Sequence, residues 1–243
     1  MKRGLQAHLP NFITCLNLVS GSLGIVFLLH GSIDYCALTI VASLLFDFLD
    51  GFIARLLNAQ SPIGKQLDSL ADMVTFGLLP GLIMQHLFQN SYPFMMVENS
   101  LKKEVISAFP LLITVFSALR LAKFNLDTRQ NDGFIGLPTP ASTIFIAGLA
   151  LALEHDRFAL TPVLNNTWIL AGISLILCWL LVSELPMIAL KFKKFGLRDN
   201  LKQYVLMAAA LLLVLFMGVT GVPLIIVLYI TLSLGKPQSA EPS

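Results

Sequence analysis

Four aspartates lie close together in a stretch that otherwise has the apolar character of membrane helices. Asp47 and Asp50 are three residues apart, and Asp68 and Asp72 are four apart, so each pair shares one face of a helix. Ionised carboxylates are costly in a low-dielectric region unless a cation meets them. The spacing therefore predicts a cation site between two membrane helices.

Small and basic residues beside the aspartates suit a phosphorylated ligand. Mg2+ and Mn2+ prefer carboxylate oxygens and share their coordination with substrate phosphates, so two aspartate pairs would hold two ions that clamp a pyrophosphate. Gly51 and Ala54 leave room for a ligand against the helix backbone, and Arg55 offers a planar donor fork for phosphate. Together these residues predict phosphoryl transfer from a nucleotide-containing donor. The structural alternatives are an aspartate that pairs two helices and Asp68 as a helix cap.

The composition indicates an integral membrane protein. Of the 243 residues, 56% are hydrophobic and 12% are charged, whereas soluble domains carry about 25% charged residues. A net charge of +2 gives no reason to expect a nucleic-acid partner. The three cysteines lie singly in apolar runs, which predicts neither a zinc site nor a disulfide framework. The N-terminal residues lack a signal-peptidase cleavage pattern, so we expect the first apolar segment to be retained.

The apolar segments predict an all-α fold, a polytopic membrane helix bundle of about eight transmembrane helices. Their approximate ranges are 11–30, 33–57, 67–89, 104–125, 138–154, 167–188, 204–219 and 222–235. We expect a six-helix catalytic core over residues 1–203, two additional C-terminal helices over 204–235 and a disordered tail over 236–243.

The distribution of basic residues predicts the orientation in the membrane. Eight spans place both termini on one side, and the positive-inside rule assigns that side to the cytoplasm. Thirteen of the sixteen basic residues then fall on the cytoplasmic side: Lys2, Arg3, Arg55, Lys65, Arg120, Lys123, Arg129, Lys191, Lys193, Lys194, Arg198, Lys202 and Lys236. We therefore expect a protein of the cytoplasmic membrane with both termini and the aspartates facing the cytosol.

The aspartate stretch resembles the signature of the CDP-alcohol phosphotransferases. The matching pattern is Asp47-x2-Asp50-Gly51-x2-Ala54-Arg55-x8-Gly64-x3-Asp68-x3-Asp72. The resemblance implies that the four aspartates bind two divalent ions, Mg2+ or Mn2+, and that Asp72 is also the catalytic base that deprotonates the acceptor hydroxyl. It further implies a homodimer. The CDP-lipid contacts that it implies are Pro10, Asn11, Thr14, Gly51, Ala54, Arg55, Ser61 and Gly64.

Other stretches favour one acceptor. LPNFITCLNLVSGSLGIVF, DSLADMVTFGLLPG and ALRLAKFN followed by GFIGLPTPAS resemble the phosphatidylserine synthases of this family. The resemblance implies transfer from CDP-diacylglycerol to L-serine with release of CMP. Arg120 is placed to pair with the serine carboxylate, with Lys123 and Asn125 nearby, although membrane-interface anchoring is the alternative for Arg120 and Lys123. We interpret the apolar loop 133–140 as a re-entrant cover over the acceptor site.

Two alternative functions make different predictions. A sibling enzyme would use glycerol 3-phosphate as acceptor and would need more cationic groups around the acceptor's phosphate. A divalent-cation transporter would also hold aspartates within the membrane, but it gives Arg55 and Gly64 no role. Within the enzyme class, direct displacement is favoured because no Ser, Cys or His is placed beside a base as a covalent nucleophile.

Overall fold

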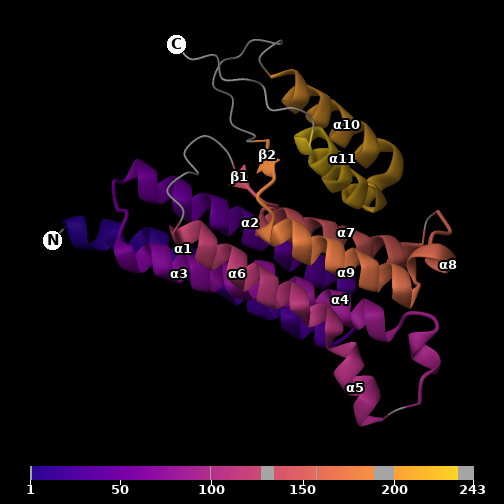
Figure 1. The fold of residues 1–243 in the computed structure, drawn as a ribbon. Helices are drawn as coiled ribbons and strands as arrows, with labels where there is room; N and C mark the ends of the chain where they lie inside the picture. Colours follow the sequence, from indigo (N-terminus) through magenta and orange to yellow (C-terminus); the bar gives the residue numbers. More distant parts are fainter. Residues whose placement is uncertain (1, 99, 127–133, 157, 189–199, 235–243) are drawn as a thin grey trace.

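The computed structural model is a bundle of long helices that run side by side, with two further helices packed along one flank (Figure 1). It describes residues 2–98, 100–126, 134–156, 158–188 and 200–234, without the side chains of residues 2–7 and of Phe134. Its elements are α1 (Lys2–Leu29), α2 (Ile33–Leu56), α3 (Pro62–Asp72), η1 (Met73–Leu78), α4 (Leu79–Gln89), η2 (Phe94–Met96), α5 (Leu101–Ser107), η3 (Phe109–Leu111), α6 (Leu112–Leu126), β1 (Phe134–Ile135), α7 (Thr139–His155), α8 (Thr161–Leu164), α9 (Thr167–Val182), β2 (Pro186–Met187), α10 (Leu201–Met217), η4 (Gly218–Gly221) and α11 (Val222–Leu234).

The length and apolar character of the helices confirm the predicted all-α membrane bundle. Five helical stretches in the described residues are long and apolar enough to cross a membrane: His8–Leu29, Ile33–Leu56, Pro62–Gln89, Leu101–Leu126 and Leu201–Leu234. The last stretch folds back at η4, so α10 and α11 lie side by side as a hairpin (Figure 1). The shorter helices α7 and α9 complete the bundle: α7 packs against α2, α4 and α11, and α9 packs against α6 and α4. The chain is therefore an integral membrane protein.

Two of the helix boundaries that differ from the prediction have a local reason. The third long helix begins at Pro62 rather than near 67, because the Ser61 side chain caps it by accepting a hydrogen bond from the Gly64 N–H at 3.0 Å. The sixth segment ends at Val182 rather than near 188, because Pro186–Met187 pairs with Phe134–Ile135 as a short antiparallel ribbon. The expected disordered tail, residues 127–133 and most of the basic stretch before α10 lie outside the described residues.

The loop that was expected to cover the acceptor site is buried at Gly136, Leu137 and Thr139 and half-buried at Ile135, Pro138 and Pro140. Gly136 has a φ of 73° and donates its N–H to the Leu185 carbonyl at 2.9 Å. A Cβ at this position would lie 2.8 Å from the Ser183 carbonyl oxygen, so both its conformation and its surroundings require glycine. Leu137 is fully buried and donates its N–H to the Leu180 carbonyl. The entry to α7 is thus fixed against the end of α9.

A π-helical turn, η1, interrupts the third long helix directly after Asp72. Such turns loosen the regular hydrogen-bond ladder and occur frequently at functional sites. Hydroxyl groups from two neighbouring helices donate to its carbonyls: Thr143 of α7 to Phe76 at 3.2 Å and Thr114 of α6 to Gly77 at 3.1 Å. The Thr75 hydroxyl of η1 itself donates to the Asn17 carbonyl of α1 at 3.4 Å. η1 therefore joins three helices around the last aspartate of the motif.

Close packing of glycine in α1 brings η1 against that helix. A Cβ built on Gly21 would lie 3.0 Å from the Cα of Thr75, which is too close. Because Thr75 Cα belongs to the backbone, the clash would be relieved only if α1 and η1 moved apart. We expect Gly21→Ala to lower the free energy of unfolding by about 1–3 kcal/mol, the usual cost of overpacking a tight contact. Thermal unfolding of the detergent-solubilised protein measures this loss. Gly172→Ala in α9 is the matched control, since a Cβ there meets nothing within 4 Å; equal losses from both variants would contradict the packing argument.

Candidate active site

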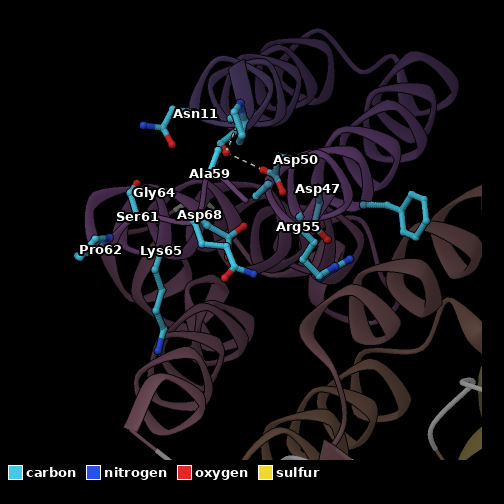
Figure 2. Close-up of a pocket in the computed structure, with 16 residues that line it drawn as sticks. Asn11, Asp47, Asp50, Arg55, Ala59, Ser61, Pro62, Gly64, Lys65 and Asp68 are labelled. Carbon is cyan, nitrogen blue, oxygen red and sulfur yellow. Dashed lines mark hydrogen bonds between the residues drawn. The ribbon is translucent and has the colours of Figure 1, made fainter. Parts of the chain in front are cut away.

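A pocket of about 720 Å³ lies where α1, the end of α2 and the start of α3 meet (Figure 2). The loop between α2 and α3 is short because Asn58 adopts a positive φ of 49° just after α2 and Ser61 caps α3. All the residues predicted to contact the CDP-lipid line this pocket: Pro10, Asn11, Thr14, Gly51, Ala54, Arg55, Ser61 and Gly64. Residues of α1 and of the start of α3, about 50 positions apart in the chain, thus line one cavity.

Three of the four aspartates converge on the pocket. Asp47 and Asp50 come from α2, and Asp68 comes from α3. One carboxylate oxygen from each of the three lies within 4.8 Å of the others. Asp50 is buried and accepts a hydrogen bond from the Thr14 hydroxyl at 2.6 Å. Within the described residues, no lysine or arginine forms an ion pair with these carboxylates. The donor set and its uncompensated charge fit a hard divalent cation.

Asp72 lies one turn beyond Asp68 and does not line the pocket. Its carboxylate accepts a hydrogen bond from the Asn17 side-chain amide at 3.2 Å. Asn17 is fully buried, and its side-chain carbonyl oxygen has no partner among the described residues. The last aspartate is therefore held at the inner side of the motif, next to η1.

Asn17 is a residue that sequence reasoning missed, although a signal was present. Thr14 and Asn17 are three residues apart on α1, the same separation as Asp47 and Asp50 on α2. Thr14 reaches Asp50 and Asn17 reaches Asp72. One face of α1 thus supplies a polar partner to each helix of the aspartate motif.

Close approach of α3 to α1 explains the glycine at position 64. A Cβ at Gly64 would lie 2.9 Å from the Asn11 side-chain oxygen and 3.0 Å from the Ser61 hydroxyl oxygen. Figure 2 shows Asn11, Ser61 and Gly64 together on one side of the pocket, with the aspartates on the other. This side presents an amide and a hydroxyl to a ligand, although the Ser61 hydroxyl also caps α3.

The opposite wall is formed by the last two turns of α2. The Arg55 guanidinium extends over Gly51, where a Cβ would lie 3.6 Å from its nearest nitrogen. Phe48 also lines the pocket, yet 63% of its side chain is exposed, and its ring stacks on Phe52 with the centroids 6.1 Å apart. A cationic group and an outward-facing aromatic pair therefore border the same cavity.

The residues predicted to bind the acceptor are separated by the structure. Arg120 is buried, with 7% of its surface exposed, and its Nε has no partner in the described part of the chain. Lys123 is exposed. The Asn125 side-chain amide donates to the Ser69 hydroxyl at 2.8 Å, and the Asn125 main-chain carbonyl accepts from the Lys65 ammonium at 3.2 Å. Asn125 thus joins α6 to α3, and none of the three predicted residues lines the pocket.

Arg120 belongs to a second group of buried polar atoms, on the inner side of Asp72. We call this group the Arg120 region and define it by Asn17, Asp72, Ser117 and Arg120. Arg120 lies one turn after Ser117 on α6, and Ser117 faces Gly77 of η1, the π-helical turn that follows Asp72. The Ser117 hydroxyl is buried without a partner among the described residues. Buried polar atoms are normally hydrogen-bonded, so this region suits water or a small polar ligand.

Comparison with known proteins identifies the family. Residues 7–182 match the family described as CDP-alcohol phosphatidyltransferase. The chain is similar to the CDP-diacylglycerol–serine O-phosphatidyltransferase of Helicobacter pylori strain J99, at 33% identity over 84% of this chain and 80% of the relative. It is also similar to the proteins of that name in Bacillus subtilis (34% identity, 65% and 79% covered) and Mycobacterium bovis (33%, 76% and 63%). This chain belongs to the CDP-alcohol phosphatidyltransferase family.

Proposed function

We propose that this protein transfers the phosphatidyl group of CDP-diacylglycerol to L-serine, forming phosphatidylserine and releasing CMP. The observation that carries the proposal is the convergence of Asp47, Asp50 and Asp68 on one pocket that also contains Arg55. The names of the similar proteins supply the donor and the acceptor. The chemistry of the pocket supports the donor, and the chemistry of the Arg120 region supports the acceptor.

The donor's pyrophosphate suits the pocket between α1, α2 and α3. Its negative charge is complementary to the Arg55 fork, and Gly51 leaves space for it beneath the guanidinium. We assign the cytidine end to the side bordered by Asn11, Ser61 and Gly64, because amide and hydroxyl groups there can pair with a base or ribose.

The four aspartates would hold two divalent ions, Mg2+ or Mn2+. Asp47, Asp50 and Asp68 offer the oxygens, with Asp72 next along α3. When bound, the ions would neutralise the pyrophosphate and stabilise the charge that develops on the leaving phosphate. Removal of the ions with a chelator is therefore expected to abolish activity.

Asp72 is the proposed general base. Asn17 holds its carboxylate by one hydrogen bond, which leaves the second carboxylate oxygen for the serine hydroxyl. As Asp72 accepts the hydroxyl proton, the serine oxygen forms a bond to the phosphorus that carries diacylglycerol. The bond from this phosphorus to the bridging oxygen breaks, and CMP leaves with that oxygen.

We propose that the serine amino acid moiety occupies the Arg120 region. Arg120 would pair with the carboxylate, and the unpartnered oxygens of Asn17 and Ser117 are acceptors for the ammonium group. Arg120 is the only lysine or arginine that is buried within the described ranges. Glycerol 3-phosphate, which carries a dianionic phosphate, would call for further cations there, and this favours serine.

The orientation and assembly remain proposals. We propose that the pocket end of the bundle and both termini face the cytosol in the cytoplasmic membrane, in line with the positive-inside distribution. The division into a catalytic core over residues 1–203 and a C-terminal pair over 204–235, and the homodimer, stay predictions.

An acceptor-competition assay tests the proposed function. Purified protein in mixed micelles with CDP-diacylglycerol and Mg2+ or Mn2+ is expected to incorporate labelled serine into chloroform-extractable lipid. An excess of unlabelled serine should suppress the signal. The same excess of glycerol 3-phosphate should not, because the proposed site has a single buried cation among the described residues. Incorporation of glycerol 3-phosphate in place of serine would overturn the acceptor assignment and leave the donor assignment intact.

The base assignment makes a sharper prediction. Asp72→Asn keeps the size of the side chain but removes its proton affinity, so we expect kcat to fall by about 10²–10⁴-fold, the usual contribution of a general base. Binding of CDP should change less, since Asp72 does not line the pocket; equilibrium binding of labelled CDP measures this. Wild-type turnover by the variant would show that another group removes the proton.

The Asn17 contact predicts a loss of rate without a loss of donor affinity. Asn17→Ala removes a hydrogen bond to a carboxylate, which contributes about 1.5–3 kcal/mol, so kcat should fall by about 10- to 100-fold. The KM for CDP-diacylglycerol should stay near that of the wild type, because Asn17 does not border the pocket. Ser43→Ala is the control, since within the described residues its hydroxyl donates a hydrogen bond only to the Asn17 main-chain carbonyl, at 3.5 Å. Equal effects of the two variants would point to packing rather than to Asp72.

A further inference from the structure

Two hydrogen bonds tie α6 to the long helix that carries Asp72. In the first contact, the Asn125 side-chain amide of α6 donates to the Ser69 hydroxyl of α3 at 2.8 Å. In the second contact, the Thr114 hydroxyl of α6 donates to the Gly77 carbonyl of η1 at 3.1 Å. The two contacts lie on opposite sides of Asp72 in the sequence, so the two helices run antiparallel and are joined at two points.

The register of this helix pair places Arg120 at the level of Asp72. Counted from the first contact, Asp72 lies three residues after Ser69, and Arg120 lies five residues before Asn125. The second contact lies five and six residues beyond them, respectively. At about 1.5 Å of rise per residue, the levels of the two residues differ by about 3 Å, which is less than one helical turn.

The first contact belongs to a closed ring of hydrogen bonds. The Ser69 hydroxyl donates its proton to the Lys65 carbonyl at 3.1 Å, so its oxygen presents lone pairs to the Asn125 amide. The Lys65 ammonium donates at 3.2 Å to the Asn125 main-chain carbonyl, one of the last carbonyls of α6, which have no partner within the helix. Figure 2 shows the Lys65 side chain directed away from the aspartates. Three hydrogen bonds therefore hold the end of α6 to α3.

Apolar packing contributes less at this end of α6 than in its middle. Ile113, Ser117, Arg120 and Leu121 are buried, whereas residues 122–124 and Leu126 are exposed. An exposed last turn gains little from the hydrophobic effect. The position of this end relative to α3 therefore depends mainly on the ring of hydrogen bonds.

We propose that Ser69 and Asn125 are positioning residues for the acceptor, which hold Arg120 level with Asp72. The cation and the general base then act on one serine molecule, Arg120 at its carboxylate and Asp72 at its hydroxyl. Neither Ser69 nor Asn125 lines the pocket, so both act through the register of the helices. The inference rests on the proposed function, because that function assigns the serine carboxylate to Arg120.

Substitution of Ser69 by alanine tests the inference. Ser69→Ala removes the acceptor of the Asn125 amide, so we expect the KM for serine to rise by about 3- to 10-fold, the usual effect of one hydrogen bond. The KM for CDP-diacylglycerol and the binding of labelled CDP should stay near the wild-type values, because Ser69 does not line the pocket. A loss of folded protein would instead lower kcat and leave both KM values unchanged.

Ser22→Ala is the matched control. The Ser22 hydroxyl donates to the Leu18 carbonyl one turn earlier in α1 at 2.8 Å, as the Ser69 hydroxyl does to Lys65 in α3. Among the described residues, however, Ser22 accepts no hydrogen bond from another helix. The control should therefore leave the serine KM unchanged. Equal rises in the serine KM of the two variants would overturn the inference.

A double-mutant cycle tests whether Ser69 and Asn125 act through their shared hydrogen bond. Asn125→Ala should raise the serine KM as Ser69→Ala does, and the double variant should show no further rise. Additive rises would show that the two residues act separately and would overturn the inference. A wild-type protein that incorporates no serine would refute the proposed function and the inference together. Serine incorporation by the wild type with an unchanged KM in Ser69→Ala would refute the inference alone.

Discussion

The negative charge of the aspartate motif is the constraint on which the site depends. Three carboxylates meet within one pocket, and no cationic side chain of the described residues neutralises them by a direct ion pair. Such a group is stable at the end of a membrane bundle only if a bound cation and polar neighbours compensate it. The side chains around it serve this need: Thr14 bonds Asp50, Asn17 bonds Asp72, and Arg55 lies beside Gly51. One face of α1 is polar for this reason.

The π-helical turn η1 lies between this charged pocket and the buried polar atoms of the Arg120 region. In a regular α-helix after Asp72, the carbonyls would be paired with N–H groups of the same helix. The carbonyls of η1 instead accept hydrogen bonds from threonine hydroxyls of α6 and α7. These contacts bring α6, which carries Ser117 and Arg120, against the turn that follows Asp72. In the proposed reaction, the CDP-lipid and the acceptor would then meet from opposite sides of the Asp72 carboxylate. A direct displacement at phosphorus requires that the attacking and leaving oxygens lie roughly in line, and this arrangement suits it.

The motif spacing predicted the pocket well, because the periodicity of a helix fixes which residues share a face. The four aspartates were expected to meet, and Asp47, Asp50 and Asp68 do so. A Cβ at Gly51 would meet only the Arg55 guanidinium, whereas Gly64 is required by the close approach of Asn11 and Ser61. η1 was not predictable from Met73–Leu78 alone, since the hydroxyls that stabilise it come from distant helices. The antiparallel pairing of Phe134–Ile135 with Pro186–Met187 also depends on residues 50 positions apart. Asn125 was expected near the acceptor, but its amide is engaged by Ser69, a contact that hydropathy does not encode.

The exposed ring of Phe48 has a consequence for how a lipid reaches the site. It lines the pocket and at the same time forms, with Phe52, an exposed apolar part of the surface of α2, a helix long and apolar enough to cross a membrane. In the proposed orientation the cavity would border the membrane along its side, so that a lipid headgroup would enter from the leaflet while its chains stay among neighbouring lipids. An enzyme built in this way pays no desolvation cost for the tails and has little means of measuring their length. Its selectivity would lie in the polar groups, and its supply of donor would follow the local composition of the leaflet.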